Sequence, residues 1–288
     1  MARDPARRRR DAPYRRQMRR EALNRLLPNA LTMLGLCAGL TAVRFGLEGN
    51  WKAGILLIAA AALLDTLDGR IARLMGGPTE FGGQLDSLVD SIAFGVAPVV
   101  LIYLWSLGSA GGIGWAVSLI FTVCCVLRLA RFNVASADPD LPAWAGSFFS
   151  GVPAPAGAGL VLLPLILSVQ TGWAFLHSPL LTGPWTLIVA ALMISRIPTF
   201  SLKRVRVPQR NVRLAMAGIA ALAAVAISEP WIALSGLIVA YAASIPLSIR
   251  SFRRRQQEET AAAPAGAEAG AGIETAGVNG EDEVPPRI

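Results

Sequence analysis

The sequence predicts an all-α, polytopic integral membrane protein with about eight transmembrane helices. The chain has 288 residues, of which 53% are hydrophobic and 16% charged, and its mean hydropathy is +0.50. Because a soluble domain typically carries about 25% charged residues, this composition indicates a protein that lies largely in lipid. Long apolar runs recur along the chain, and short clusters of basic residues separate them, as in helices that cross a bilayer.

Each predicted helix is close to the roughly 20 residues that are needed to cross the hydrocarbon core. Apolar residues occur on every side of these segments rather than in one stripe, which is typical of helices with a lipid-facing surface. The predicted spans are residues 29–47, 51–75, 82–107, 112–134, 149–171, 183–201, 211–228 and 231–250.

Basic residues are concentrated in the loops on one side of the predicted membrane. The opposite loops hold only Glu48, His177 and Glu229, with Lys52 at an edge. The positive-inside rule therefore predicts that both termini are cytoplasmic. The basic residues between and after the spans that lie on the cytoplasmic side in this topology are Arg70, Arg73, Arg128, Arg131, Lys203, Arg204, Arg206, Arg210, Arg250 and Arg253–Arg255.

Composition divides the chain into three regions. Residues 1–27 form a basic arm, expected in the cytoplasm on anionic lipid headgroups, and an organellar presequence is the alternative. Residues 28–255 form the transmembrane domain. Residues 256–288 are rich in Ala, Gly, Glu and Pro and are predicted to be disordered. The pI of 10.4 is explained by arginines that flank apolar runs, so no nucleic-acid partner is expected.

Four aspartates within 26 residues carry the candidate chemistry: Asp65, Asp68, Asp86 and Asp90. An aspartate in the middle of a membrane helix costs about 2.5–3.5 kcal/mol, so this cluster requires compensation. Arg70 and Arg73 can neutralise two of the carboxylates, but ion pairing does not account for their spacing.

The spacing of the aspartates predicts a single site. The first two are three residues apart and the last two are four apart, so each pair lies on one helix face. A turn at residues 75–81, with two glycines and a proline, brings the pairs together on the cytoplasmic side. Such an oxygen-rich pocket suits Mg²⁺ or Mn²⁺, ions that neutralise phosphate oxygens and activate a hydroxyl for phosphoryl-type transfer.

Glycines flank both aspartate pairs. Gly69 follows Asp68 directly, and Gly82 is expected to open the next helix. Glycine inside a helix costs about 1 kcal/mol relative to alanine. Close approach of a ligand to the backbone and close packing of two helices both account for these residues.

Residues 65–90 read DTLDGRIARLMGGPTEFGGQLDSLVD. This stretch resembles the CDP-alcohol phosphotransferase family, whose signature is D-x2-D-G-x2-A-R-x8-G-x3-D-x3-D. Further similarity to bacterial and archaeal phosphatidylserine synthases lies in AFGVAP after the signature, RLARFN at 128–133 and FSGVPAPA at 149–156. The signature positions are Asp65, Asp68, Gly69, Ala72, Arg73, Gly82, Asp86 and Asp90.

The resemblance implies a six-helix catalytic core plus two further helices, a homodimer, and transfer of a phosphatidyl group from CDP-diacylglycerol to an alcohol with release of CMP. It implies that Asp65, Asp68 and Asp86 bind two Mg²⁺ or Mn²⁺ ions, with Asp90 as base and further ligand. Gly69, Ala72, Arg73 and Gly82 then shape the nucleotide and phosphate site. PNALTML at 28–34 resembles the opening helix of the family, in which Asn29 and Thr32 contact the cytidine.

The resemblance to phosphatidylserine synthases points to L-serine as the acceptor. Arg131 and Asn133, at the cytoplasmic end of the fourth span, are expected to hold serine, because arginine suits a bidentate contact with a carboxylate. Membrane anchoring or phosphate binding by Arg128 and Arg131 is the alternative. The family usually has Ser where this chain has Ala93, which weakens the case for serine.

Two other functions compete with this interpretation. Glycerol 3-phosphate or an inositol phosphate as acceptor requires the same chemistry. A cation- or proton-coupled transporter requires carboxylates at the membrane midplane and commonly an internal repeat, and the sequence shows no such repeat. Direct attack by serine is favoured over a covalent intermediate, because no fixed signature position is Ser, Cys or His. The expected location is the bacterial inner membrane, with the active site on its cytoplasmic side.

Overall fold

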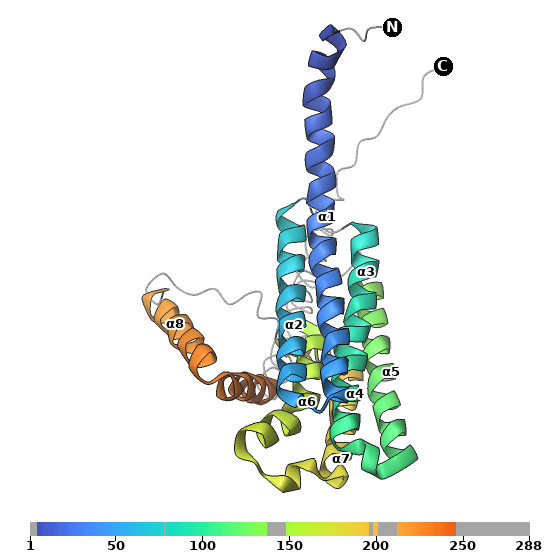
Figure 1. Cartoon of the computed structure of the whole chain (residues 1–288), viewed down its shortest axis with the longest axis vertical. Coiled ribbons are helices and arrows are strands. Elements are labelled where there is room, and N and C mark those ends of the chain that lie inside the picture. Colours follow the sequence, from blue (N-terminus) through green and yellow to red (C-terminus); the bar gives the residue numbers. More distant parts are fainter. Residues whose placement is uncertain are drawn as a thin grey trace, which may run out of the picture.

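The computed structural model describes residues 5–75, 77, 79–136, 148–195, 198–200 and 212–245. Within these residues the chain is helical apart from short connections and one pair of short strands, which confirms the predicted helical class (Figure 1). The predicted tail at 256–288 lies outside the described residues. The same holds for the basic clusters at 203–210 and 250–255 and for the side chains of residues 5–25.

Each of the eight predicted ranges contains helical structure within the described residues. The third span consists of three consecutive segments, α3, the π-helix η1 and α4. In chain order the elements are α1 (Pro5–Leu47), α2 (Trp51–Leu74), α3 (Glu80–Asp90), η1 (Ser91–Val96), α4 (Ala97–Trp105), the 3₁₀ turn η2 (Leu107–Ala110), α5 (Gly111–Ser136), β1 (Phe148–Ser150), α6 (Ala154–Thr171), the 3₁₀ turn η4 (Ala174–His177), α7 (Pro179–Ile194), β2 (Pro198–Phe200), α8 (Val212–Ser228) and a last helix, Pro230–Ile245.

Four helical stretches in the described part of the chain are long and apolar enough to cross a membrane, which indicates an integral membrane protein. They are Leu26–Leu47, Glu80–Trp105, Leu107–Val134 and Ala154–Thr171. Helix α2 has 24 residues, but its second half carries two aspartates and two arginines. Helix α7 and the last helix are apolar and shorter.

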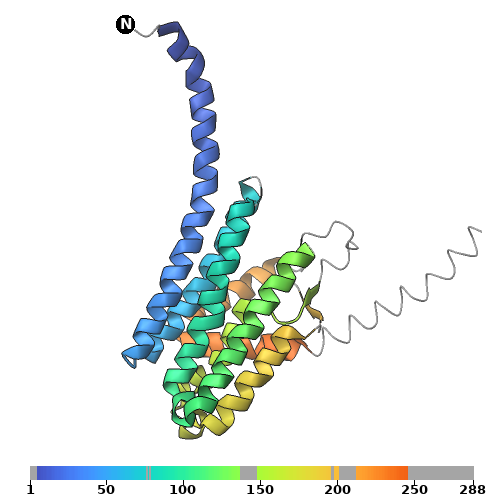
Figure 2. The same ribbon diagram turned by 90° about the vertical axis from the view of Figure 1, so that its right-hand side faces the viewer.

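Helices α1 to α7 lie side by side as a bundle (Figures 1 and 2). The α2–α3 turn lies at the end where α1 extends beyond the bundle, and the α1–α2 connection lies at the opposite end. Helix α8 and the last helix lie to one side, inclined to the bundle axis.

Prolines and a pair of strands shorten two predicted helices. Helix α6 begins at Ala154 rather than at residue 149, because Pro153 forms its N-cap and residues 148–150 are in β1. Helix α7 covers Pro179–Ile194 rather than 183–201, and residues 198–200 form β2. The strands pair antiparallel, with Phe149 opposite Thr199. The hydropathy of these segments did not distinguish a strand from a helix end.

The turn between α2 and α3 is closed by local hydrogen bonds. The Gly77 amide donates to the Ala72 carbonyl (2.9 Å), and the φ of +99° at Gly77 suits a residue without a Cβ. Thr79 is the N-cap of α3, and its hydroxyl accepts a hydrogen bond from the Gly82 amide (3.0 Å). Helix α3 therefore begins at Glu80, before Gly82, and runs antiparallel to α2.

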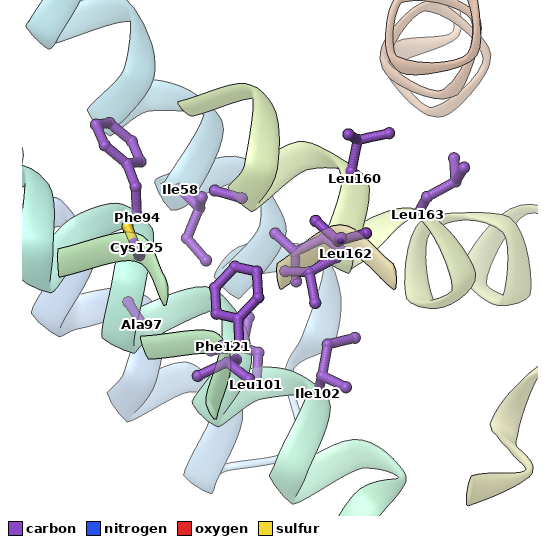
Figure 3. Packing of buried hydrophobic residues seen from close by; sticks show 14 of the residues in the cluster. Ile58, Phe94, Ala97, Leu101, Ile102, Phe121, Cys125, Leu160, Leu162 and Leu163 are labelled. Carbon is purple, nitrogen blue, oxygen red and sulfur yellow. The ribbon is translucent and has the colours of Figure 1, made fainter. Parts of the chain in front are cut away.

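The buried core lies between α2, η1, α4, α5 and α6. Figure 3 shows Ile58, Phe121 and Leu162 converging between these helices. Small residues allow the backbones to approach closely. A Cβ added at Gly39 of α1 would lie 3.0 Å from the Ala93 Cα, and one added at Gly95 would lie 3.2 Å from the Cys125 Sγ.

The contact between α1 and η1 predicts that a glycine-to-alanine substitution lowers stability at Gly39 but not at Gly236. Gly39→Ala places a methyl group against the backbone of η1, so we expect a loss of about 1–3 kcal/mol from overpacking. Gly236→Ala, in the last helix, meets open space and is expected to leave stability unchanged or slightly raised. Thermal unfolding of both variants in detergent measures the difference, and equal melting temperatures would contradict the close α1–η1 contact.

Candidate active site

Three carboxylates converge where α2 faces α3. Asp65 and Asp68 come from α2 and Asp86 from α3, and one carboxylate oxygen from each lies within 4.8 Å of the other two. Asp68 is buried and the other two are half-buried. Helical spacing within α2 and the closed α2–α3 turn together produce this arrangement.

Asp90, the last residue of α3, lines the same pocket as the three converging carboxylates. The pocket is bounded by α1 and α2 on one side and by α3 and η1 on the other. Its lining residues are Thr32, Gly35, Ala61, Asp65, Asp68, Asp86, Val89, Asp90, Ala93 and Phe94. The structure therefore brings all four signature aspartates to one pocket.

The pocket is strongly anionic. Among the described residues, no basic side chain forms an ion pair with Asp68 or Asp86, and Arg70 and Arg73 are exposed. Carboxylates at this separation repel one another, and burial increases the repulsion. Oxygen ligands clustered in this way fit Mg²⁺ or Mn²⁺, so the residues present suit the metal predicted from the sequence.

Thr32 of α1 contacts one of these carboxylates directly. Its side chain is buried, and its hydroxyl donates to Asp68 Oδ2 at 2.6 Å, with the Pro28 carbonyl 3.0 Å away as a second possible acceptor. The contact of Thr32 with a nucleotide stays a prediction. The structure adds a role that spacing did not suggest, because the hydroxyl fixes the orientation of Asp68.

The two glycines that flank the aspartates lie in different surroundings. A Cβ added at Gly82 would lie 3.1 Å from Asn29 Oδ1, so this glycine allows α3 to pack closely against α1. A Cβ added at Gly69 would meet no atom within 4 Å. Close helix packing thus accounts for Gly82, whereas Gly69 leaves the backbone of α2 accessible. Ala72, one turn further along α2, is half-buried.

The two residues predicted to hold serine connect α5 to its neighbours. Arg131 is exposed, and its Nη1 donates to the Ile194 carbonyl at the end of α7 (2.7 Å). Asn133 Nδ2 donates to Ser87 Oγ of α3 (2.8 Å), one residue from Asp86. Both residues lie at the same end of the bundle as the aspartates, and their contact with serine stays a prediction.

Arg128 is the buried arginine of this region. The sequence predicts it to be a membrane anchor or a phosphate ligand. It is 8% exposed, and its guanidinium carbon lies 5.6 Å from the centre of the Phe132 ring. The RLARFN motif contains both Arg128 and Arg131, three residues apart at the end of a helix. The sequence alone could not show which of the two is buried.

A π-helix begins directly after Asp90 and was not predicted. The Ala97 amide bonds to the carbonyl of Ile92, five residues back, and Pro98 has no amide hydrogen to donate. Thr122 of α5 donates to the Gly95 carbonyl at 3.1 Å. The wide turn allows Asp90, Ala93 and Phe94 to face one pocket, as π-turns near functional sites often do.

Comparison with known proteins agrees with this geometry. Residues 25–195 match the CDP-alcohol phosphatidyltransferase family, and this range contains the whole aspartate cluster. The chain belongs to this family. Residues 211–246, which include α8 and the last helix, match a second description, CDP-alcohol phosphatidyltransferase 2.

Relatives in the CDP-alcohol phosphatidyltransferase family include proteins named for serine transfer. The chain is 42% identical over 228 residues to CDP-diacylglycerol–serine O-phosphatidyltransferase of Mycobacterium tuberculosis, covering 79% of each chain. It is 43% identical over 235 residues to the protein of the same name from Mycobacterium leprae, covering 81% of this chain and 78% of the relative. Archaetidylserine synthase of Methanothermobacter thermautotrophicus is 34% identical over 173 residues, which is 59% of this chain and 68% of the relative.

The hydrogen bond from Thr32 to Asp68 predicts an effect on metal affinity. Thr32→Val keeps the shape of the side chain but removes the side-chain hydrogen bond to Asp68, so we expect Mn²⁺ binding to weaken roughly tenfold. Electron paramagnetic resonance of Mn²⁺ added to the purified protein measures this. Thr32→Ser should bind normally, and so should Thr41→Val, whose hydroxyl bonds only within α1. Unchanged affinity in Thr32→Val would show that the hydroxyl does not orient the ligand.

The hydrogen bond from Thr122 to the π-turn predicts an effect on turnover. Thr122→Val removes the donor to Gly95 and lets the turn after Asp90 relax, so we expect kcat to fall roughly tenfold with KM little changed. Thr122→Ser should restore the rate. A variant that loses thermal stability but keeps the wild-type kcat would limit the role of Thr122 to packing.

Proposed function

We propose that this protein transfers the phosphatidyl group of CDP-diacylglycerol to the hydroxyl of L-serine, giving phosphatidylserine and CMP. The observation that carries the proposal is the carboxylate cluster, whose oxygens lie within 4.8 Å of one another at the signature positions. Relatives that are 42–43% identical over most of their length are named for this reaction, which supports serine as the acceptor.

The aspartates would hold two divalent ions, Mg²⁺ or Mn²⁺. Asp65, Asp68 and Asp86 supply the converging oxygens, and Asp90, which lines the same pocket, would be a further ligand. When bound, such ions neutralise the diphosphate oxygens and lower the pKa of a coordinated hydroxyl. The protein contributes the fixed orientation of these carboxylates, with Thr32 holding Asp68.

Asp90 serves as the general base in this proposal. Its carboxylate takes the proton of the serine hydroxyl as the serine oxygen attacks the phosphorus that carries diacylglycerol. The bond from that oxygen to phosphorus forms, the bond from phosphorus to the CMP oxygen breaks, and CMP leaves with the electron pair. Direct attack of this kind uses one carboxylate to accept the proton and needs no covalent intermediate on the protein.

The donor would be bound along α1, α2 and the start of α3. Gly69 leaves the α2 backbone accessible, which suits close approach by a diphosphate. The exposed Arg73 supplies a cation for phosphate oxygens, and Ala72 lies beside it on α2. Gly82 and Asn29, in close contact, would form the wall near the cytidine, together with Thr32.

The membrane arrangement extends this proposal. Helices α2 and α7 would complete a six-helix core with the four spanning segments, followed by two further helices, in a homodimer surrounded by membrane lipids. Basic residues at the α2 and α5 ends favour a cytoplasmic active site in a bacterial inner membrane with both termini inside. The basic arm at 1–27, the domain at 28–255 and the disordered tail at 256–288 stay predictions.

The reaction is tested by CMP release from the purified protein in detergent with CDP-diacylglycerol and Mn²⁺ or Mg²⁺. We expect release to need both L-serine and metal, and to fall roughly 100-fold or more in Asp90→Asn, which lacks a base. Glu48→Gln, at the opposite end of the bundle, is the matched control and should react normally.

Other acceptors distinguish the alternatives in the same assay. Release with glycerol 3-phosphate or inositol 1-phosphate but not with serine would keep the chemistry and reject serine as the acceptor. No release from folded protein with any of these acceptors would reject the transferase and favour a cation- or proton-coupled transporter, to be tested by uptake into vesicles.

A further inference from the structure

Arg128 is a buried cation with an unpaired hydrogen-bond donor. Its side chain is 8% exposed, and within the described part of the chain its Nε atom has no hydrogen-bond partner and no carboxylate forms an ion pair with it. Its guanidinium carbon lies 5.6 Å from the centre of the Phe132 ring. Since burying a charge costs several kcal/mol unless it is paired, an anion bound at this guanidinium would stabilise it.

The helix pairing places Arg128 level with the proposed base. Helix α5 runs antiparallel to α3 and η1, with Thr122 bonded to the Gly95 carbonyl and Asn133 bonded to Ser87. Asp90 lies between Ser87 and Gly95 on one side, and Arg128 lies between Thr122 and Asn133 on the other. The charge of Arg128 accordingly interacts with Asp90 and, more weakly, with Asp65.

No ion pair joins the side chains of Arg128 and Asp90, so their attraction leaves the guanidinium donors unoccupied. The burial of Arg128 near the pocket also contrasts with Arg131, which is exposed and bonded to the Ile194 carbonyl. Its N–H groups are thus available to an anion that lies beside the reacting hydroxyl. The diphosphate of the donor would lie at the three clustered carboxylates, which are the proposed metal ligands.

We propose that Arg128 binds the carboxylate of the amino-acid acceptor and thereby selects serine over acceptors that lack this group. The inference rests on the proposed function. A guanidinium offers two parallel N–H donors that match a carboxylate. In serine the hydroxyl and the carboxylate are on adjacent carbons, so a hydroxyl at Asp90 places the carboxylate within reach of a neighbouring arginine.

Acceptor selectivity tests this role. Ethanolamine carries the hydroxyl and ammonium of serine without its carboxylate. The wild-type protein should prefer L-serine strongly, and Arg128→Gln should lower kcat/KM for serine on the order of 100-fold while changing the value for ethanolamine little. The KM for CDP-diacylglycerol should stay the same. Arg44→Gln, an exposed arginine at the opposite end of the bundle, should behave as wild type.

A conservative variant covers the possibility that Arg128→Gln does not fold. Arg128→Lys keeps the charge but loses the paired donors, so the KM for serine should rise roughly tenfold in protein with a wild-type melting temperature. Unchanged serine KM in folded Arg128→Lys or Arg128→Gln would overturn the proposal. Equal losses with both acceptors and a higher KM for CDP-diacylglycerol would overturn it too, and assign Arg128 to the diphosphate.

Serine-dependent CMP release by the wild-type protein distinguishes a failure of the proposed function from a failure of the role proposed for Arg128. If wild type does not use serine, the proposed function fails, whatever the variants do. If wild type uses serine and the Arg128 variants keep its full preference, only the role of Arg128 fails.

Discussion

The structure depends on holding mutually repelling carboxylates together inside a bundle of apolar helices. Three of them have oxygens within 4.8 Å of one another, in surroundings where charges are weakly screened. Covalent and packing constraints hold this cluster together against the repulsion. The constraints are the closed turn before Thr79, the close contact of α1 with η1, and the donor that Thr32 supplies to Asp68. The divalent cations expected there would turn this repulsion into attraction.

Small residues and the π-turn η1 fix the position of the segment that follows Asp90. Gly39 and Gly95 allow α1 and α5 to approach η1 closely, so the wide turn after Asp90 is held between these two helices. Thr122 satisfies one of the carbonyl groups in this turn. The same segment thus sets the depth of the proposed base and the packing of the bundle. Stability and chemistry are therefore linked in this region more closely than in the outer helices.

Much of this arrangement was predictable because it is local. The three- and four-residue spacings of the aspartates placed each pair on one helix face, and the glycine-rich turn predicted that the pairs meet. The Thr32–Asp68 and Arg131–Ile194 contacts join residues 36 and 63 positions apart, and periodicity carries no information about such pairs. Apolar composition likewise could not show that β1 and β2 are strands rather than helix ends. It also could not show that Arg128, and not Arg131, is buried.

The depth of the site has a consequence for how a lipid reaches it. Asp68 lies six residues before the end of α2, which is about 9 Å along the helix axis. In the proposed topology, a diphosphate at that level would lie close to the headgroups of the surrounding bilayer, so a donor would enter by lateral diffusion while its acyl chains stay in hydrocarbon. Extraction would cost about 0.8 kcal/mol for each methylene exposed to water. The enzyme thus needs affinity only for the headgroup, and the membrane itself concentrates the donor and removes the lipid product.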